Sequence, residues 1–234
     1  MGNKKIQEQN GSYMAQRRQI LNKNTNFAIQ EAYKSLRTNI AFSIRGQKCK
    51  RFCITSGSSG EGKSITMLNL AISIAEVGKK VLFIDADMRR PAVARLLVEQ
   101  ANPGLSEVLA GEARESDAIR KDIYPNLDIL FSGEIPPNPS ELLSSERMQE
   151  LIETNTEKYD YILVDTPPVG VVTDACVVAN LLDGVLILVR QSATLKNNVK
   201  QAVNSLQLTG AKILGFVMNG VSPKVRKDYD HYYR

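Results

Sequence analysis

Short runs of apolar residues alternate with amphipathic segments along most of the chain. From Lys50 onward the apolar runs are RFCITS, KKVLFIDAD, LDILFSG, YDYILVDTPP, DGVLILVR and KILGFVMNG. They are nearly continuous in Val, Ile and Leu, which is typical of strands covered by helices on both faces. The segments between them have helical spacing, most clearly from Lys63 to Glu76. The pattern predicts an α/β fold, with a mostly parallel sheet between two helical layers.

The two ends of the chain lack this pattern. Residues 1–26 are rich in Asn, Gln, Lys and Arg without a sustained apolar period, and a helix is expected to begin near Phe27. We therefore expect a flexible basic arm over residues 1–26, a single domain over 27–221 and a flexible tyrosine-rich tail over 222–234. Within the domain, a helix should begin after Asn138, because Pro139 suits the first helical position.

Composition narrows the class of protein. The chain has 234 residues, which suits one domain, and its net charge is +5. The first 50 residues hold ten basic and two acidic side chains, so the arm could contact an acidic partner or simply be solvated. Three cysteines without a C-x-x-C pair argue against a disulfide framework or a metal–cysteine site, and the apolar runs are too short to span a membrane. We expect a reduced, cytoplasmic chain without a nucleic-acid partner.

The clearest chemical signal is the segment GSSGEGKS, which fits G-x-x-x-x-G-K-[ST] between a predicted strand and a predicted helix. Glycines expose backbone N–H groups to phosphates, while Lys63 would contact the β- and γ-phosphates and Ser64 the magnesium ion. The segment predicts an ATP-binding loop formed by Gly57, Ser58, Ser59, Gly60, Glu61, Gly62, Lys63 and Ser64.

Carboxylates at the ends of two predicted strands form the second signal. Asp85 and Asp87 are spaced i, i+2 after one strand, and Asp165 ends another. Beside a magnesium nucleotide, Asp85 could activate the incoming nucleophile while Asp87 and Asp165 hold the metal or its water. The alternative is that the first two acids form ordinary ion pairs with Arg89 and Arg90 in a solvated loop.

These motifs, the segment PPNPSELL and a tail with tyrosines together resemble the bacterial tyrosine kinases, which regulate capsule and exopolysaccharide synthesis. The resemblance runs from about Glu31 to the carboxyl end, and it identifies the phosphate loop and the two acidic segments as Walker A, A′ and B motifs. It implies a P-loop NTPase-like fold, ATP and Mg²⁺ as cofactors, and Lys63, Asp85 and Asp87 as catalytic residues. By the same resemblance Asn219 would contact the nucleotide base.

The resemblance also implies partners. Glu31, Lys34 and Arg37 are similar to an E-x-x-R-x-x-R motif through which such kinases form rings, although lysine replaces the middle arginine. A solvated charged helix face is the alternative. Further implied partners are a membrane-embedded activator on a separate chain, which would recruit the protein to the inner face of the cell membrane, a phosphotyrosine phosphatase and protein substrates.

The tail YDHYYR contains Tyr229, Tyr232 and Tyr233. We expect it to reach a neighbouring subunit and be autophosphorylated, with Asp85 as the base for the phenol. It could instead pack on its own domain or stack on bases.

Two other classes of function stay open. An ATP-hydrolysing dimerisation switch, of the kind used in septum placement and DNA partition, shares the fold, but such switches usually carry a signature lysine where this chain has Ser58. The second class is a scaffold with negligible chemistry, in which ATP only sets the oligomeric state.

Overall fold

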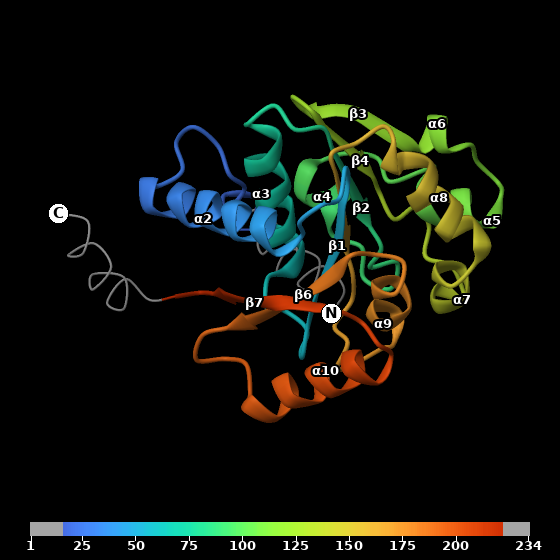
Figure 1. Ribbon diagram of the computed structural model, residues 1–234. Coiled ribbons are helices and arrows are strands. Elements are labelled where there is room, and N and C mark those ends of the chain that lie inside the picture. The colour runs from blue at the N-terminus through green and yellow to red at the C-terminus, as the bar shows by residue number, and fades with distance from the viewer. Residues whose placement is uncertain (1–15, 222–234) are drawn as a thin grey trace, which may run out of the picture.

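The computed structural model describes residues 16–221, and its centre is a seven-stranded sheet. The strand order is β3-β4-β2-β5-β1-β6-β7, and every neighbouring pair is parallel except β3 and β4. Figure 1 shows the helices in two layers on opposite sides of this sheet. The strands are β1 (Lys50–Ser56), β2 (Val81–Asp85), β3 (Ile119–Tyr124), β4 (Leu127–Leu130), β5 (Tyr161–Asp165), β6 (Gly184–Arg190) and β7 (Ile213–Asn219). The predicted fold class is confirmed.

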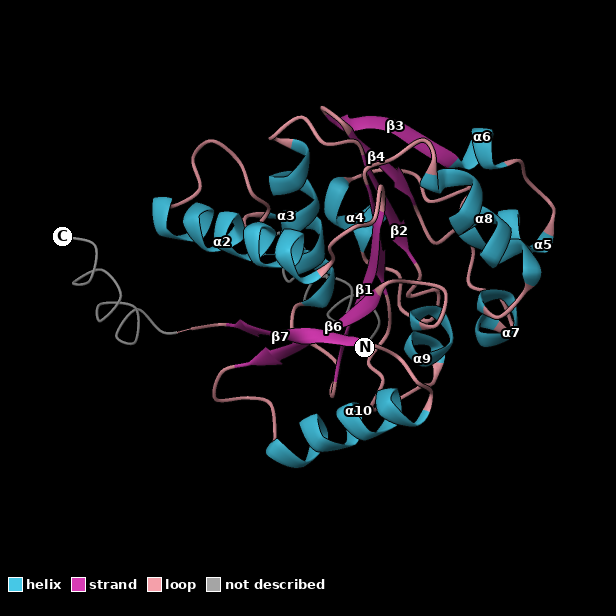
Figure 2. Ribbon diagram, viewed as in Figure 1, coloured by secondary structure: helices cyan, strands magenta, loops and turns pink. Residues whose placement is uncertain are grey.

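Each layer of helices covers its own apolar core. One core lies under α2, α3 and α4, and the other under α5 to α10, with the sheet between them (Figure 2). The helices are α2 (Phe27–Ser43), α3 (Lys63–Ala75), α4 (Val93–Leu97), α5 (Leu105–Ala110), α6 (Glu115–Ala118), α7 (Pro139–Leu143), α8 (Glu146–Thr156), α9 (Asp174–Ala179) and α10 (Lys196–Leu208). Because β1, β2 and β5 contact both cores, their residues are almost entirely buried, which explains their continuous apolar sequences.

The edge strand β3 was not anticipated from the sequence. It pairs antiparallel with β4, and their register shifts between Arg120 and Tyr124. Asp122, inside the irregular stretch, has a φ of 51°. A short polar strand of this kind lacks the run of apolar residues that marks the central strands.

Within the expected arm, residues 19–21 contact the domain. Ile20 and Leu21 are buried in the same core as α3, and the backbone N–H of Leu21 donates to Asn69 Oδ1 at 2.8 Å. Two adjacent apolar residues are enough to anchor this segment, although they form no periodic pattern. Residues 1–15 lie outside the described part of the chain.

The helix predicted after Asn138 is present as α7, and α8 follows it with Ser145 as N-cap. The Asn138 side chain makes no capping bond to the backbone and instead donates to Glu141 Oε2 at 2.7 Å. In the part of the chain that the structure describes, no helix has the length and apolar character needed to cross a bilayer.

Candidate active site

Residues 57–62 form a loop that joins β1 to α3, and Lys63 and Ser64 are the first two residues of that helix, as predicted. Gly62 precedes the helix with a φ of 97°, and a Cβ built on it would lie 2.4 Å from Asn219 Nδ2. The left-handed backbone favours glycine here, and a side chain at this position would have to displace the Asn219 amide. The loop delivers Lys63 and Ser64 to the first turn of a thirteen-residue helix, whose amino end favours anions.

Three side chains from the β6–β7 side hold this loop, two by its backbone carbonyls and one by a side-chain hydroxyl. Asn198 Nδ2 donates to Ser58 Oγ at 2.7 Å, Arg190 Nη1 to the Gly60 carbonyl at 3.2 Å, and Asn219 Nδ2 to the Glu61 carbonyl at 2.9 Å. Arg190 and Asn198 were missed from the sequence. Arg190 ends a strand as Asp165 does, which is the one signal that could have singled it out.

The predicted base-binding residue, Asn219, thus supports the phosphate loop. Its Oδ1 also accepts from the Gly220 N–H at 2.8 Å. Contact between Asn219 and a nucleotide base stays a prediction.

Asp85 and Asp165 end the neighbouring strands β2 and β5 in matching register. Both are fully buried, and neither carboxylate has a hydrogen-bond partner of ordinary geometry among residues 16–221. Lys63 is also buried, with 7% of its surface exposed, and its charge acts on Asp165 and Asp87. The sheet therefore brings together the phosphate-loop lysine and the strand-end acids.

The burial of these acids perturbs their titration. Burial, together with the charges of Asp165 and Asp87, raises the pKa of Asp85 well above its usual value. Burial raises the pKa of Asp165 to about 7, although the Lys63 ammonium and the Ser64 hydroxyl oppose the rise. Desolvated carboxylates without partners are costly in the free protein, and a positive charge placed between them would relieve that cost.

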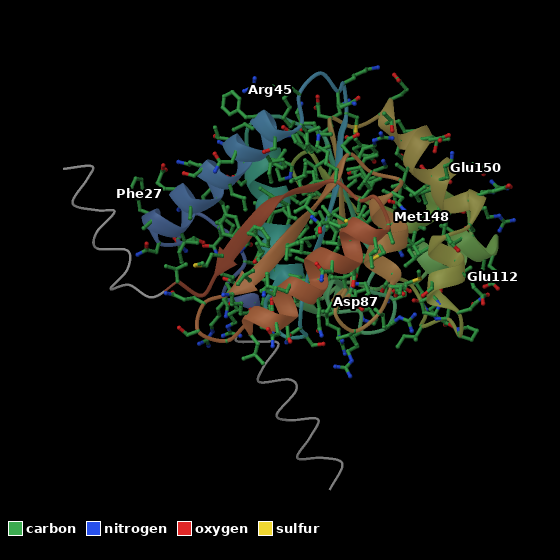
Figure 3. The ribbon with its side chains drawn as sticks, turned by 60° about the horizontal axis from the view of Figure 1, so that its bottom comes forward. Phe27, Arg45, Asp87, Glu112, Met148 and Glu150 are labelled. Atoms are coloured by element: carbon green, nitrogen blue, oxygen red, sulfur yellow. The ribbon has the colours of Figure 1, made fainter. Side chains whose placement is uncertain are left out.

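Asp87 is half-buried, and burial raises its pKa while Lys63 opposes the rise. Its Oδ1 accepts from the backbone N–H of Arg90 at 3.1 Å. Arg89 does not form the alternative ion pair with the acids of this loop, because its guanidinium pairs with Asp174 instead. Figure 3 shows that Asp87 lies away from Phe27, the first residue of α2.

A third buried carboxylate belongs to Glu61 in the phosphate loop. Its two oxygens have no hydrogen-bond partner of ordinary geometry within the described residues. Burial raises its pKa, against the opposing effects of the Thr194 hydroxyl and Lys63.

The residues fit a magnesium nucleotide. No group of three His, Cys, Asp or Glu side chains in residues 16–221 could hold a metal ion unaided. Mg²⁺ beside ATP needs only one or two protein oxygens, because phosphate and water supply the others. Ser64, Asp87 and Asp165 offer such oxygens, and the buried carboxylate of Asp165, next to the Ser64 hydroxyl, is an acceptor suited to a cation or its water.

The predicted assembly residues lie on α2. Lys34 Nζ pairs with Glu31 Oε1 at 2.7 Å on the exposed side of this helix. Arg37 turns the other way and donates to the carbonyl and hydroxyl oxygens of Ser73 on α3. Their role in assembly stays a prediction, and Tyr229, Tyr232 and Tyr233 lie outside the described residues.

Known proteins with this architecture share a nucleotide-binding fold. A family model described as an AAA domain matches residues 49–213. The chain is 40% identical over 202 residues to tyrosine-protein kinase YwqD of Bacillus subtilis, covering 86% of this chain and 85% of that protein.

Solved structures agree with this relationship. The kinase domain of the Escherichia coli tyrosine kinase ETK matches with a TM-score of 0.79 at 36% identity, covering 82% of this chain and 75% of that one. The septum site-determining protein MinD from Pyrococcus horikoshii, bound to Mg-ADP, is more distant: its TM-score is 0.63 at 27% identity, covering 77% of this chain and 76% of that one. The chain therefore belongs to the bacterial tyrosine-protein kinases, within the AAA-domain nucleotide-binding proteins.

Proposed function

We propose that this chain transfers the γ-phosphoryl group of Mg-ATP to tyrosine, including its own Tyr229, Tyr232 and Tyr233, and so regulates capsule or exopolysaccharide synthesis. The observation that supports the chemistry best is the pair of fully buried carboxylates, Asp85 and Asp165, beside the phosphate-loop lysine. Family membership supports tyrosine as the acceptor.

In the reaction, backbone N–H groups of the phosphate loop and the Lys63 ammonium bind the triphosphate. The tyrosine oxygen forms a bond to the γ-phosphorus as the bond to the bridging oxygen breaks, and ADP leaves with that electron pair. The phenolic proton passes to the carboxylate of Asp85, the acid at the end of β2 beside Asp165. Ser64, Asp87 and Asp165 would hold Mg²⁺, and the ion would supply positive charge that offsets the charge of the phosphate oxygens.

The finer assignments rest on family resemblance. The chain would form a ring-like homo-oligomer in which one subunit phosphorylates the tail of the next. A membrane-embedded activator on a separate chain would recruit it from the cytoplasm to the inner face of the membrane, and a phosphotyrosine phosphatase would reverse the modification. Protein substrates other than the tail are expected as well.

Mixing two variants tests transfer to the tail between subunits. One is Lys63→Met, which keeps the tail but should not use ATP; the other keeps the site but has Phe at positions 229, 232 and 233. With Mg-ATP, phosphotyrosine should map to the tail of the Lys63→Met chain only when both variants are present. An unmodified tail in that mixture and in the wild type would exclude the tail as acceptor.

The same mixture addresses the alternative of an ATP-hydrolysing switch. A switch would release the γ-phosphate to water and leave every tyrosine unlabelled. Ser58 stands where such switches usually carry lysine, and its hydroxyl is engaged by Asn198 of the same chain.

A further inference from the structure

Three segments around the active site meet at the carboxylate of Asp174, the first residue of α9. Asp174 is fully buried and accepts hydrogen bonds from Arg89 Nε at 2.8 Å, Arg89 Nη2 at 3.0 Å and Ser140 Oγ at 2.5 Å. Arg89 Nη2 also donates to Ser140 Oγ at 2.9 Å, so the three side chains form a closed network. We call this network the Asp174 latch.

The Asp174 latch holds the loop that carries Asp87. This loop leaves β2 after Asp85, and its start is fixed to β5 by a backbone bond from the Ala86 N–H to the Asp165 carbonyl at 2.8 Å. Two residues beyond Asp87, the Arg89 guanidinium reaches across to α9. Asp87 therefore lies between two anchors, one at the Walker B strand and the other at Asp174.

The geometry of the Asp174 latch indicates that the ion pair fixes the orientation of Arg89, and does not only attract it. A planar guanidinium bound by both nitrogens to one carboxylate fixes direction as well as distance. A buried ion pair is seldom more stabilising than apolar packing of the same shape, so its best use is to specify one arrangement. None of its three residues belongs to the phosphate loop, which has its own supports in Asn198, Arg190 and Asn219.

We propose that Asp174 is a positioning residue for phosphoryl transfer, which acts through Arg89 and Ser140 to hold the Asp87 loop against the nucleotide site. This inference rests on the proposed kinase activity. It assigns the Ser140 hydroxyl, in the segment PPNPSELL, a part in aligning the reaction. Loosening the latch leaves ATP binding intact, misaligns the acids at the reacting phosphate and lets water compete with tyrosine.

The test uses the full chain with Asp174→Asn and, as a milder change, Ser140→Ala. For each variant, the KM for ATP, the kcat for phosphotyrosine formation and the ratio of phosphotyrosine to free phosphate are measured. Asp174→Asn should lower kcat by about 10- to 100-fold, because a displacement of about 1 Å costs this much in an aligned reaction. Ser140→Ala should lower kcat less, and both should keep the KM within about threefold while the ratio falls.

Asp128→Asn is the matched control for loss of a structural carboxylate. Asp128, on β4, accepts hydrogen bonds from Lys121 Nζ at 2.8 Å, Tyr159 Oη at 2.6 Å and the Asp122 N–H at 2.8 Å. The Asp128→Asn variant should have a lower melting temperature but the same ratio of phosphotyrosine to free phosphate as the wild type.

The outcomes separate the two proposals. Absence of phosphotyrosine in the wild type would refute the proposed function itself. A wild type that transfers, with Asp174→Asn and Ser140→Ala keeping the wild-type ratio, would overturn the latch alone. If Asp174→Asn fails to fold, Ser140→Ala provides the test. A Ser140→Ala variant with the wild-type kcat and the wild-type ratio of phosphotyrosine to free phosphate would contradict the role of the latch.

Discussion

Replacing Asp165 by asparagine should stabilise the nucleotide-free protein at alkaline pH while impairing its use of Mg-ATP. Burial raises the pKa of Asp165 from 3.8 to about 7 in the folded chain. An acid with a higher pKa in the folded state binds its proton more tightly when folded. Folding is therefore favoured at low pH, and stability is lost as the pH rises from about 4 to about 7.

The size of the effect follows from the same numbers. A rise from 3.8 to about 7 corresponds to at most about 4 kcal/mol of unfavourable free energy at pH 8, where the carboxylate is charged. A buried amide without partners costs about 1–3 kcal/mol, so the net gain for Asp165→Asn is about 1–3 kcal/mol. In a domain of this size, that raises the melting temperature by roughly 2–10 °C.

Thermal unfolding without nucleotide, followed by circular dichroism at pH 5 and pH 8, measures this gain. The advantage of Asp165→Asn should be present at pH 8 and shrink at pH 5, where the wild-type carboxyl is largely protonated. Added Mg-ADP should stabilise the wild type more than the variant, because the variant lacks one of the charges proposed to hold the metal. A variant less stable than the wild type at pH 8, or an advantage equal at both pH values, would refute the reasoning.

Three further changes test the remaining parts of the structure. Lys63→Met should abolish tight ATP binding, measured by calorimetry, and wild-type affinity would exclude this lysine from the site. Asp85→Ala should still bind ATP but lower turnover by about 10²- to 10⁴-fold, and unchanged turnover would show that another group activates the nucleophile. For Asp128, burial raises its pKa, but hydrogen bonds from Lys121 and Tyr159 together with the Asp122 N–H hold it below its usual value. Its contribution to stability is present above the unfolded pKa of about 4 and is lost as the pH falls through the folded value, so Asp128→Asn should destabilise the protein at pH 7 and little at pH 2. Chemical unfolding at the two pH values measures this, and an equal loss at both would contradict it.

The central sheet could be predicted because its strands carry their signal locally. β1, β2 and β5 are buried on both faces, so each is a run of apolar residues, and Asp85 and Asp165 mark the edge where parallel strands end. The glycine pattern of the phosphate loop is similarly local. Such features need no knowledge of distant partners.

The side-chain pairings that the sequence did not predict depend on contacts between segments far apart in the chain. Its place in the sequence suggests that Arg89 pairs with the acids beside it, yet it pairs with Asp174, 85 residues away. Arg37 was grouped with Glu31 and Lys34 by helical spacing, but its guanidinium turns to Ser73 on α3. Nothing in the local sequence distinguishes these partners, because the fold of the whole chain decides which side chains meet.

The central claim is that this site passes the γ-phosphate to tyrosine. Incubating the wild-type chain with Mg-ATP labelled at the γ-phosphate, then measuring label on tyrosine against label released as free phosphate, tests it directly. Transfer to tyrosine should give label on tyrosine that depends on Mg²⁺ and on Lys63. Label found only as free phosphate, with no phosphotyrosine at any time or protein concentration, would contradict it.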